Sequence, residues 1–172
     1  MAGFQQLGSF EDLYEHSSHG RQPATLRDTE RAMSEEPTTP DLVELVRSAY
    51  DASNRRDFDA MMSVYRRDAV WDMTPIGLGS YEGLAAIRDF FEGWVGAYEE
   101  WQAEPEEIRD LGGGVTLAVV LQSGRLAGSD GRIEWRYAQV SVWVERVAVR
   151  TTNYLDTDDA RAAAERLAAE QG

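Results

Sequence analysis

The side chains able to carry out chemistry in this sequence are of few types. There is no Cys, all 17 basic residues are Arg, and both His residues, His16 and His19, lie within the first 20 positions. A thiolate nucleophile and a Lys Schiff base are therefore excluded, and a His base or ligand would have to come from the N-terminal segment. Proton transfer in a folded domain would have to use Asp, Glu, Tyr or Arg-assisted water. We expect neither a metal ion nor a cofactor.

One cluster of carboxylates has the composition of a cation site. It consists of Glu99, Glu100, Glu104, Glu106 and Glu107. A calcium loop needs oxygen ligands at fixed spacings, and this cluster instead spans a helix end and a strand. We interpret it as solvated surface.

The net charge limits the classes of partner that the protein can bind. The formal net charge is −14, and 42% of the residues are hydrophobic. Binding to nucleic acid or to an anionic lipid surface needs a basic face, which this balance disfavours. No apolar run approaches the ~18 residues of a membrane span, and residues 1–10 show no secretory signal. We therefore expect a cytoplasmic protein that binds neither nucleic acid nor membranes.

The chain divides into a tail and one domain. Residues 1–38 lack a sustained hydrophobic period and end in a Pro-rich joint, which predicts disorder, and Met33 is an alternative start of translation. Residues 39–170 carry periodic apolar positions over a length that suits one hydrophobic core. We expect the tail to be dispensable for the stability of the domain.

Hydrophobic periodicity predicts that this domain is α+β. Thr39 and Pro40 are typical of a helix start, Asp57 can cap a second helix, and Pro75 closes the first strand. Helices are expected at about 40–55, shortly after 57, at 83–99 and from 157 through 167. Strands are expected at 69–74, 102–110, 115–125, 133–144 and 147–156.

A tight turn at Glu145-Arg146 predicts the register of the last two strands. Val144 would pair with Val147, and further along Ala138 would pair with Asn153. One face of the sheet would then carry Arg136, Ala138, Val140, Thr151 and Asn153. The opposite face would carry Trp135, Tyr137, Gln139, Ser141 and Trp143.

Four stretches of the sequence carry a resemblance to a known family. They are residues 50–60 (YDASNRRDFDA), 68–71 (DAVW), 81–91 (YEGLAAIRDFF) and 153–156 (NYLD). Their order and spacing resemble the nuclear-transport-factor-2-like superfamily, and its SnoaL-like branch in particular, over about residues 41–157. The resemblance implies a cone-shaped, bent antiparallel sheet wrapped around three N-terminal helices, with a central pocket.

The resemblance also implies which side chains line the pocket, because the Asn153 face of the sheet looks into the cavity in such proteins. The expected pocket residues are Trp71, Met73, Phe91, Trp94, Arg136, Ala138, Val140, Thr151 and Asn153. Plain core packing is the alternative for the rings and Met73, and a position at the mouth with its head group in water is the alternative for Arg136. The opposite face, with Trp135, Tyr137 and Trp143, would join a homodimer.

The catalytic residues of two related enzyme classes are not retained. Ketosteroid isomerases of this fold use a carboxylate base with Tyr and carboxylic acid donors, and those positions align with Met73 or Thr74, Ala49 and Ala138. Tyr50 could replace the missing Tyr only if the first helix were rotated by about 100°. Limonene epoxide hydrolases place a Tyr, an Asn and a carboxylate at positions aligned with Trp71, Met73 and Asn153.

The polyketide cyclases of this fold give a weaker comparison. They use a carboxylate or His in the sheet, and the counterpart here is Gln139, which cannot transfer a proton at neutral pH.

Three functions stay open. The first is a domain that binds a small apolar ligand, the second is an enzyme acting on a small apolar natural product or degradation intermediate without the usual base, and the third is a dimerisation module. We favour the ligand-binding domain.

Overall fold

The computed structural model describes residues 41–172. The expected tail, the Met33 start and the Thr39-Pro40 helix start lie outside the described residues. The first described helix, α2 (Leu42–Asn54), is capped by Asp41, whose side chain accepts a hydrogen bond from the Glu44 backbone N–H at 2.8 Å. Asp57 caps the short helix α3 (Phe58–Met62) as expected, because its carboxylate accepts from the Ala60 N–H at 3.0 Å.

The remaining elements follow the predicted order. They are β1 (Tyr65–Asp72), the 3₁₀ turn η1 (Thr74–Ile76), β2 (Ser80–Glu82), α4 (Leu84–Gly96), β3 (Tyr98–Asp110), β4 (Val115–Leu126), β5 (Arg132–Val144), β6 (Val147–Tyr154) and α5 (Thr157–Gln171). Strand β2 lies in a stretch between the first predicted strand and the helix at 83–99, where no strand is predicted. No helix within residues 41–172 combines the length and apolar character needed to cross a bilayer.

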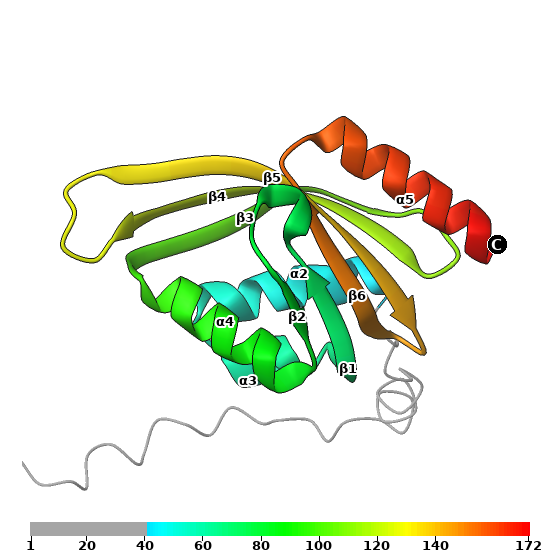
Figure 1. Ribbon diagram of the computed structural model, residues 1–172, viewed down its shortest axis with the longest axis horizontal. Helices are drawn as coiled ribbons and strands as arrows, with labels where there is room; N and C mark the ends of the chain where they lie inside the picture. The colour runs from blue at the N-terminus through cyan, green and yellow to red at the C-terminus, as the bar shows by residue number, and fades with distance from the viewer. Residues whose placement is uncertain (1–40) are drawn as a thin grey trace, which may run out of the picture. The chain divides into compact units, whose positions relative to one another are not determined.

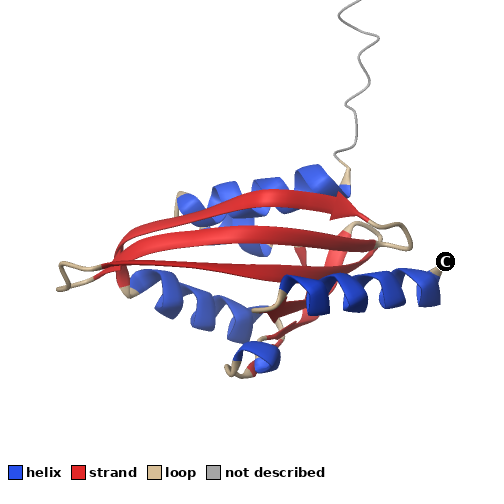
Figure 2. Ribbon diagram, turned by 90° about the horizontal axis from the view of Figure 1, so that it is seen from above, coloured by secondary structure: helices blue, strands red, loops and turns tan. Residues whose placement is uncertain are grey.

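The six strands form one curled sheet in the order β2-β1-β6-β5-β4-β3. Helices α2, α3 and α4 lie on one side of it, and α5 lies on the other (Figures 1 and 2). This arrangement confirms the predicted α+β architecture. The sheet is mixed rather than wholly antiparallel, because β1 runs parallel to β6, with Trp71 beside Thr151.

The predicted register of β5 and β6 is wrong beyond the first residues of the hairpin. The two-residue turn is present, with φ of 49° at Glu145 and 67° at Arg146, and Val144 pairs with Val147. After the pair Trp143–Ala148 the register shifts by one, because Val149 is an extra residue on β6. This β-bulge turns every later residue of β6 to the opposite face relative to the prediction.

The bulge therefore reverses the assignment of the two faces of β5. Gln139, not Ala138, pairs with Asn153, and Ser141 pairs with Thr151. The inner face, toward α2, α3 and α4, carries the odd-numbered residues of β5 from Trp135 to Trp143. The outer face carries the even-numbered residues from Arg136 to Val144.

This reversal also removes the predicted dimer surface. Tyr137 and Trp143 are each only 6% exposed, because they face helices of their own chain. The Trp143 indole N–H donates to Thr116 Oγ1 at 2.8 Å. Trp135 is half-buried and packs against the same core. The homodimer itself stays a prediction, and the aromatic row does not offer an exposed interface for it.

Each face of the sheet has its own hydrophobic core. The inner core joins β1, β5 and β6 to α2, α3 and α4, and it contains most of the aromatic rings. The outer core lies between the sheet and α5, and it consists of Val115, Leu117, Val119, Ala138, Val140, Ala160 and Ala164. Helix α5 is capped by Asp156, whose side chain accepts from the N–H groups of Asp158 and Asp159.

At the free edge of the sheet, the side chain of the last residue of α2 pairs with one residue of β3. Asn54 accepts from the Ala103 backbone N–H at 2.8 Å and donates to the Ala103 carbonyl at 2.9 Å. Further along β3, Glu106 forms a bulge next to Pro105. At the opposite edge, β2 has only three residues.

Candidate functional site

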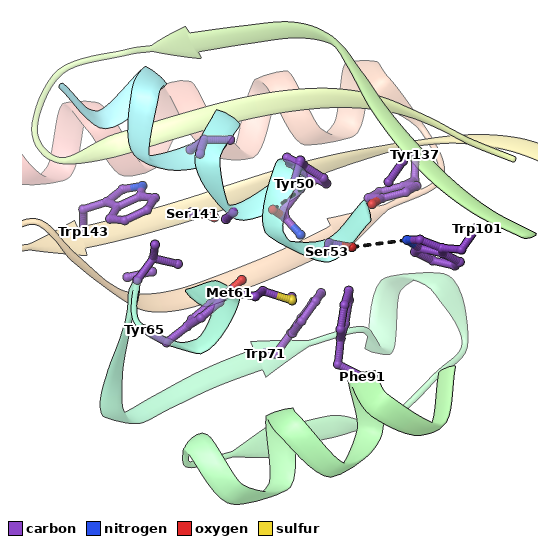
Figure 3. A pocket seen from close by; sticks show the side chains of 16 residues that line it. Tyr50, Ser53, Met61, Tyr65, Trp71, Phe91, Trp101, Tyr137, Ser141 and Trp143 are labelled. Atoms are coloured by element: carbon purple, nitrogen blue, oxygen red, sulfur yellow. Dashed lines mark hydrogen bonds between the residues drawn. The ribbon is translucent and has the colours of Figure 1, made fainter. Parts of the chain in front are cut away.

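The candidate site is an interior cavity between the inner face of the sheet and the helices (Figure 3). Its volume is about 30 Å³, which is room for about two waters. Its walls come from α2, α3, α4 and four of the strands, β1, β3, β5 and β6. They are formed by Val46, Ala49, Tyr50, Ser53, Met61, Val64, Tyr65, Trp71, Phe91, Trp101, Ala103, Tyr137, Gln139, Ser141, Trp143 and Ala148.

A second cavity of about 20 Å³ adjoins the first. It is lined by Trp71, Met73, Phe90, Phe91, Trp94, Trp101, Gln122, Trp135, Tyr137 and Asn153. Four rings, those of Trp71, Phe91, Trp101 and Tyr137, belong to both walls. A change in the position of these rings would therefore join the two cavities into one larger space.

Stacked rings form the floor shared by the cavities. Tyr65 and Trp71 stack with centroids 6.0 Å apart and planes at 16°, and Trp71 stacks on Phe91 at 5.3 Å and 26°. Trp101 meets Phe91 edge to face at 6.3 Å. Such surfaces favour a flat apolar ligand, because offset and edge-to-face contacts between rings add to the hydrophobic gain of burial.

A chain of hydrogen bonds crosses the inner face of the sheet beside these rings. The Trp71 indole Nε1 donates to Asn153 Oδ1 at 3.2 Å, and Gln139 Nε2 donates to the same oxygen at 3.1 Å. Tyr50 Oη donates to Gln139 Oε1 at 3.0 Å. An indole N–H can only donate, so Trp71 fixes which end of the Asn153 amide carries the oxygen. The orientation of Gln139 and the direction of the Tyr50 hydroxyl follow from it.

Tyr50 is the residue whose position departs most from expectation. It is only 8% exposed and lines the first cavity together with Ala49. Neighbouring residues of a helix point about 100° apart, and the apolar arc of α2 is wide enough to include both. The structure therefore places a Tyr hydroxyl in the cavity without any rotation of the helix.

Two further hydrogen bonds that involve hydroxyl groups complete the polar part of the cavity wall. Ser141 Oγ and Thr151 Oγ1 lie 3.0 Å apart on neighbouring strands. The Trp101 Nε1 donates to Ser53 Oγ at 3.2 Å, as the dashed line in Figure 3 shows. All these groups are uncharged, so the wall offers hydrogen bonds without an ionic partner.

Burial sets the protonation state of the three tyrosines in this wall. It raises the pKa of Tyr65 to about 12, with a small opposing effect of the Thr151 hydroxyl. It also raises the pKa of Tyr50 and of Tyr137, since each would place a negative charge in an apolar interior. The three phenols are therefore neutral at pH 7 and act as hydrogen-bond donors rather than bases.

The cavity walls within residues 41–172 contain no Asp, Glu, Arg or His. Asp72, which directly follows Trp71, accepts from Thr74 Oγ1 at 2.6 Å and pairs with Arg150 at 2.6 Å. The Thr74 hydrogen bonds, followed by Arg150, lower its pKa. The site therefore combines neutral donors and acceptors with aromatic surface, and its walls hold no group that accepts a proton near pH 7.

The structure brings together some of the predicted pocket residues. Trp71 and Phe91 line both cavities, and Met73, Trp94 and Asn153 line the second. Thr151 is buried behind Ser141 on the same side of the sheet. Their role in binding a ligand stays a prediction.

Three predicted pocket residues lie elsewhere. Ala138 and Val140 belong to the outer core beneath α5. Arg136 is exposed and forms a two-point ion pair with Glu106, at 2.5 and 2.8 Å. All three stand at even positions of β5, so the bulge at Val149 is the physical reason for each correction.

Sequence reasoning missed several polar residues of the cavity walls, among them Tyr50, Tyr65, Tyr137, Gln139 and Ser141. The alternation of Tyr137, Gln139 and Ser141 along β5 is a visible signal, but only the register decides whether it faces the helices. Of the acidic cluster, Glu99, Glu100, Glu106 and Glu107 form exposed ion pairs with Arg side chains. Within residues 41–172 no three His, Asp or Glu side chains are arranged to hold a metal ion.

A curled sheet that encloses a cavity against three helices defines the nuclear-transport-factor-2-like class of domain. A family model for the SnoaL-like domain matches residues 46–146, more than half of the chain. The chain belongs to the SnoaL-like family. No functionally curated protein matches the sequence.

Solved structures share this fold at low sequence identity. A protein with a ketosteroid isomerase-like fold from Catenulispora acidiphila, in complex with trimethylamine, has a TM-score of 0.60 and 15% identity, covering 74% of this chain and 94% of its own. A nuclear-transport-factor-2-like protein of unknown function from Burkholderia pseudomallei has a TM-score of 0.60 and 19% identity, covering 73% and 98%. SalBIII, an epoxide hydrolase/cyclase-like enzyme of pyran ring formation in salinomycin, has a TM-score of 0.59 and 20% identity, covering 69% and 92%.

Proposed function

We propose that this domain binds a small, uncharged, largely apolar molecule in the interior cavities. The observation that carries the proposal is the composition of their walls, which combine aromatic rings with neutral hydroxyl and amide groups. Ligand sites are typically apolar with a few polar groups that set orientation. A charged ligand would lose its hydration without gaining an ionic partner there.

The free space in the structure is smaller than such a ligand, so binding must move side chains. The four shared rings are the natural candidates, because their displacement merges both cavities. Trp101 is half-buried on the edge strand β3, and its indole is held by one hydrogen bond to Ser53. It also borders a surface groove formed with Asn54, Arg56 and neighbouring residues of β3. Movement of Trp101 would therefore open a route from solvent to the cavities.

An enzyme acting on a small apolar compound is the second candidate. The observation in its favour is the pair of buried phenols, Tyr50 and Tyr137, since neutral Tyr hydroxyls can stabilise an oxyanion. A carboxylate base is missing from the cavity walls within residues 41–172, which removes the usual partner of such donors. We therefore rank binding above catalysis, and expect no turnover of ketosteroid or epoxide substrates.

A panel of uncharged aromatic and terpenoid compounds tests the proposal by thermal shift and by quenching of tryptophan fluorescence. A ligand at a hundredfold excess over its Kd stabilises the fold by about 2.7 kcal/mol, which raises the melting temperature by roughly 10 °C. Ala148→Val fills the first cavity and should weaken binding, whereas Ala162→Val on the exposed side of α5 should not. The proposal is wrong if no compound binds, or if both variants bind equally well.

The homodimer is a separate proposal, because it rests on the family resemblance alone. Light scattering of the purified protein tests it directly. Trp143→Glu is not a suitable probe of an interface, since Trp143 is buried within its own chain. A variant at that position would report the cost of burying a charge instead.

A further inference from the structure

The second cavity contains a hydrogen-bond donor that the fold itself does not use. Asn153 is 3% exposed, and its Oδ1 accepts from both Trp71 and Gln139. Its Nδ2, with two hydrogens, donates to no residue within 41–172. In that part of the chain, every side-chain nitrogen or oxygen that is fully enclosed has a hydrogen-bond partner. Because Nδ2 has none, it is not fully enclosed. The open space that Asn153 lines is the second cavity.

Two more buried polar side chains line the same cavity. Gln122 and Tyr137 are 3% and 6% exposed, and they supply an amide and a hydroxyl that is neutral at pH 7. The rest of the wall is almost entirely aromatic. A ligand that suits this wall, once the shared rings have moved to admit it, has a flat apolar body and a polar atom placed against Asn153.

The chemistry of that polar atom follows from the donor. An oxygen with free lone pairs would accept the N–H of Asn153, whereas an ammonium group would meet a like partial charge. A carboxylate would lie in an apolar cavity whose wall holds no cation, so its desolvation would outweigh the hydrogen bonds. We propose that the ligand is an uncharged aromatic carbonyl compound whose oxygen accepts a hydrogen bond from Asn153 Nδ2, an inference that rests on the proposed binding function.

Asn153→Asp isolates this one interaction. The aspartate keeps an oxygen where Oδ1 accepts from Trp71 and Gln139. In its ionised form, which these two donors and a pH of 8 favour, it replaces the cavity-facing donor by an acceptor. The matched control is Gln102→Glu, the same amide-to-acid change at an exposed position of β3. Two probes with the same carbon skeleton, acetophenone and ethylbenzene, differ in the presence of the carbonyl oxygen, and benzoate adds a charge.

Calorimetry with the full chain should show that the acetophenone to ethylbenzene affinity ratio falls about fivefold or more in Asn153→Asp, the effect of one buried hydrogen bond. Gln102→Glu should leave the ratio unchanged, and benzoate should bind to neither protein. An unchanged ratio in Asn153→Asp, or binding of benzoate as tight as that of acetophenone, overturns the inference.

A second measurement needs no variant. The carbonyl stretch of acetophenone bound to the natural sequence should lie at lower frequency than in hexane, because a hydrogen bond weakens the C=O bond. A frequency equal to that in hexane overturns the inference. If acetophenone fails to bind while other compounds of the panel do, this inference is wrong and the binding function stands. If the whole panel fails, the proposed function is wrong as well.

Discussion

The two faces of the sheet are built from alternating residues of the same strands, yet they differ in kind. The outer face meets α5 through small aliphatic side chains, such as Val140 against Ala160 and Ala164. The inner face meets its helices through large rings and amide groups, such as Trp71, Tyr137 and Gln139. Both faces are buried, but the two cavities described above are lined by the inner face.

The difference shows how side-chain size affects the packing of each face of the sheet. Small aliphatic groups between a strand and a helix pack closely, so each methylene group that is removed lowers the stability of the fold. Large flat rings cannot interdigitate as completely, and the space they leave collects polar groups that need partners. The outer face is therefore closely packed, whereas the inner face leaves the space in which we propose that a ligand binds.

The largest expected effect comes from opening a void in the outer core. Leu117 is 1% exposed, and Leu117→Ala should lower the free energy of unfolding by about 3 kcal/mol in urea denaturation. The control Leu155→Ala, at a position that is 57% exposed, should change it by less than about 0.5 kcal/mol. Affinity for a cavity ligand should stay the same in both variants. A parallel loss of affinity in Leu117→Ala would show that the two faces are not independent.

Burial of Tyr65 on the inner side of the sheet should make the stability of the domain depend on pH in alkaline solution. Below pH 10 both folded and unfolded chains keep the Tyr65 proton, so this group leaves stability unchanged. Between pH 10 and 12 the unfolded state loses the proton while the folded state retains it, because burial raises the pKa to about 12. Stability should fall across this window by about 2–3 kcal/mol. Tyr65→Phe should flatten the decline in denaturation measured from pH 9 to 12, and an unchanged slope would contradict the assignment.

Removing one hydroxyl from the polar chain should have a moderate effect. Tyr50→Phe keeps the ring but leaves Gln139 Oε1 without its donor, so it should cost about 1–2 kcal/mol of stability. Tyr154→Phe on the other side of the sheet, where Tyr154 packs against the outer core, is the matched control and should cost less than about 0.5 kcal/mol. Equal losses for the two tyrosines would mean that the Tyr50 hydroxyl is not part of the network.

The smallest effect is expected at Arg136. Its ion pair with Glu106 is exposed, so Arg136→Gln should change the free energy of unfolding by less than about 0.5 kcal/mol. It should also leave the affinity for uncharged ligands unchanged, because the side chain lies on the outer face. Glu106→Gln should behave alike in the same assays. A marked loss of ligand affinity in Arg136→Gln alone would restore this residue to the pocket.

Most of the fold could be predicted from sequence, because helix and strand periods are local properties. Asp57 as a cap, the turn at Glu145-Arg146 and the order of the elements follow from residues close together in the chain. Strand β2 is too short to produce a period. Its three residues form a strand only because β1 lies beside them, with Trp71 opposite Tyr81.

The site could be predicted only in part, since it depends on pairing between distant residues. Trp71, Phe91 and Asn153 were reachable from the first strand, the third helix and the resemblance. Ala138 and Val140 were assigned to the wrong face because nothing in the sequence around Val149 marks a bulge, with neither Gly nor Pro there. Because successive side chains of a strand point to opposite faces of the sheet, one extra residue moves every later residue to the face opposite to the predicted one.

The two hydrogen bonds of Asn54 to Ala103 have a consequence for encounters between copies of the chain. An edge strand normally exposes N–H and C=O groups that a strand of another molecule can pair with, which is a common start of aggregation. Here one side chain already occupies both groups of Ala103, and the Pro105–Glu106 bulge interrupts the line that follows. At this one point of the edge, the last residue of α2 thus takes the place of a residue of a seventh strand, which should make pairing with another copy of the chain less favourable there.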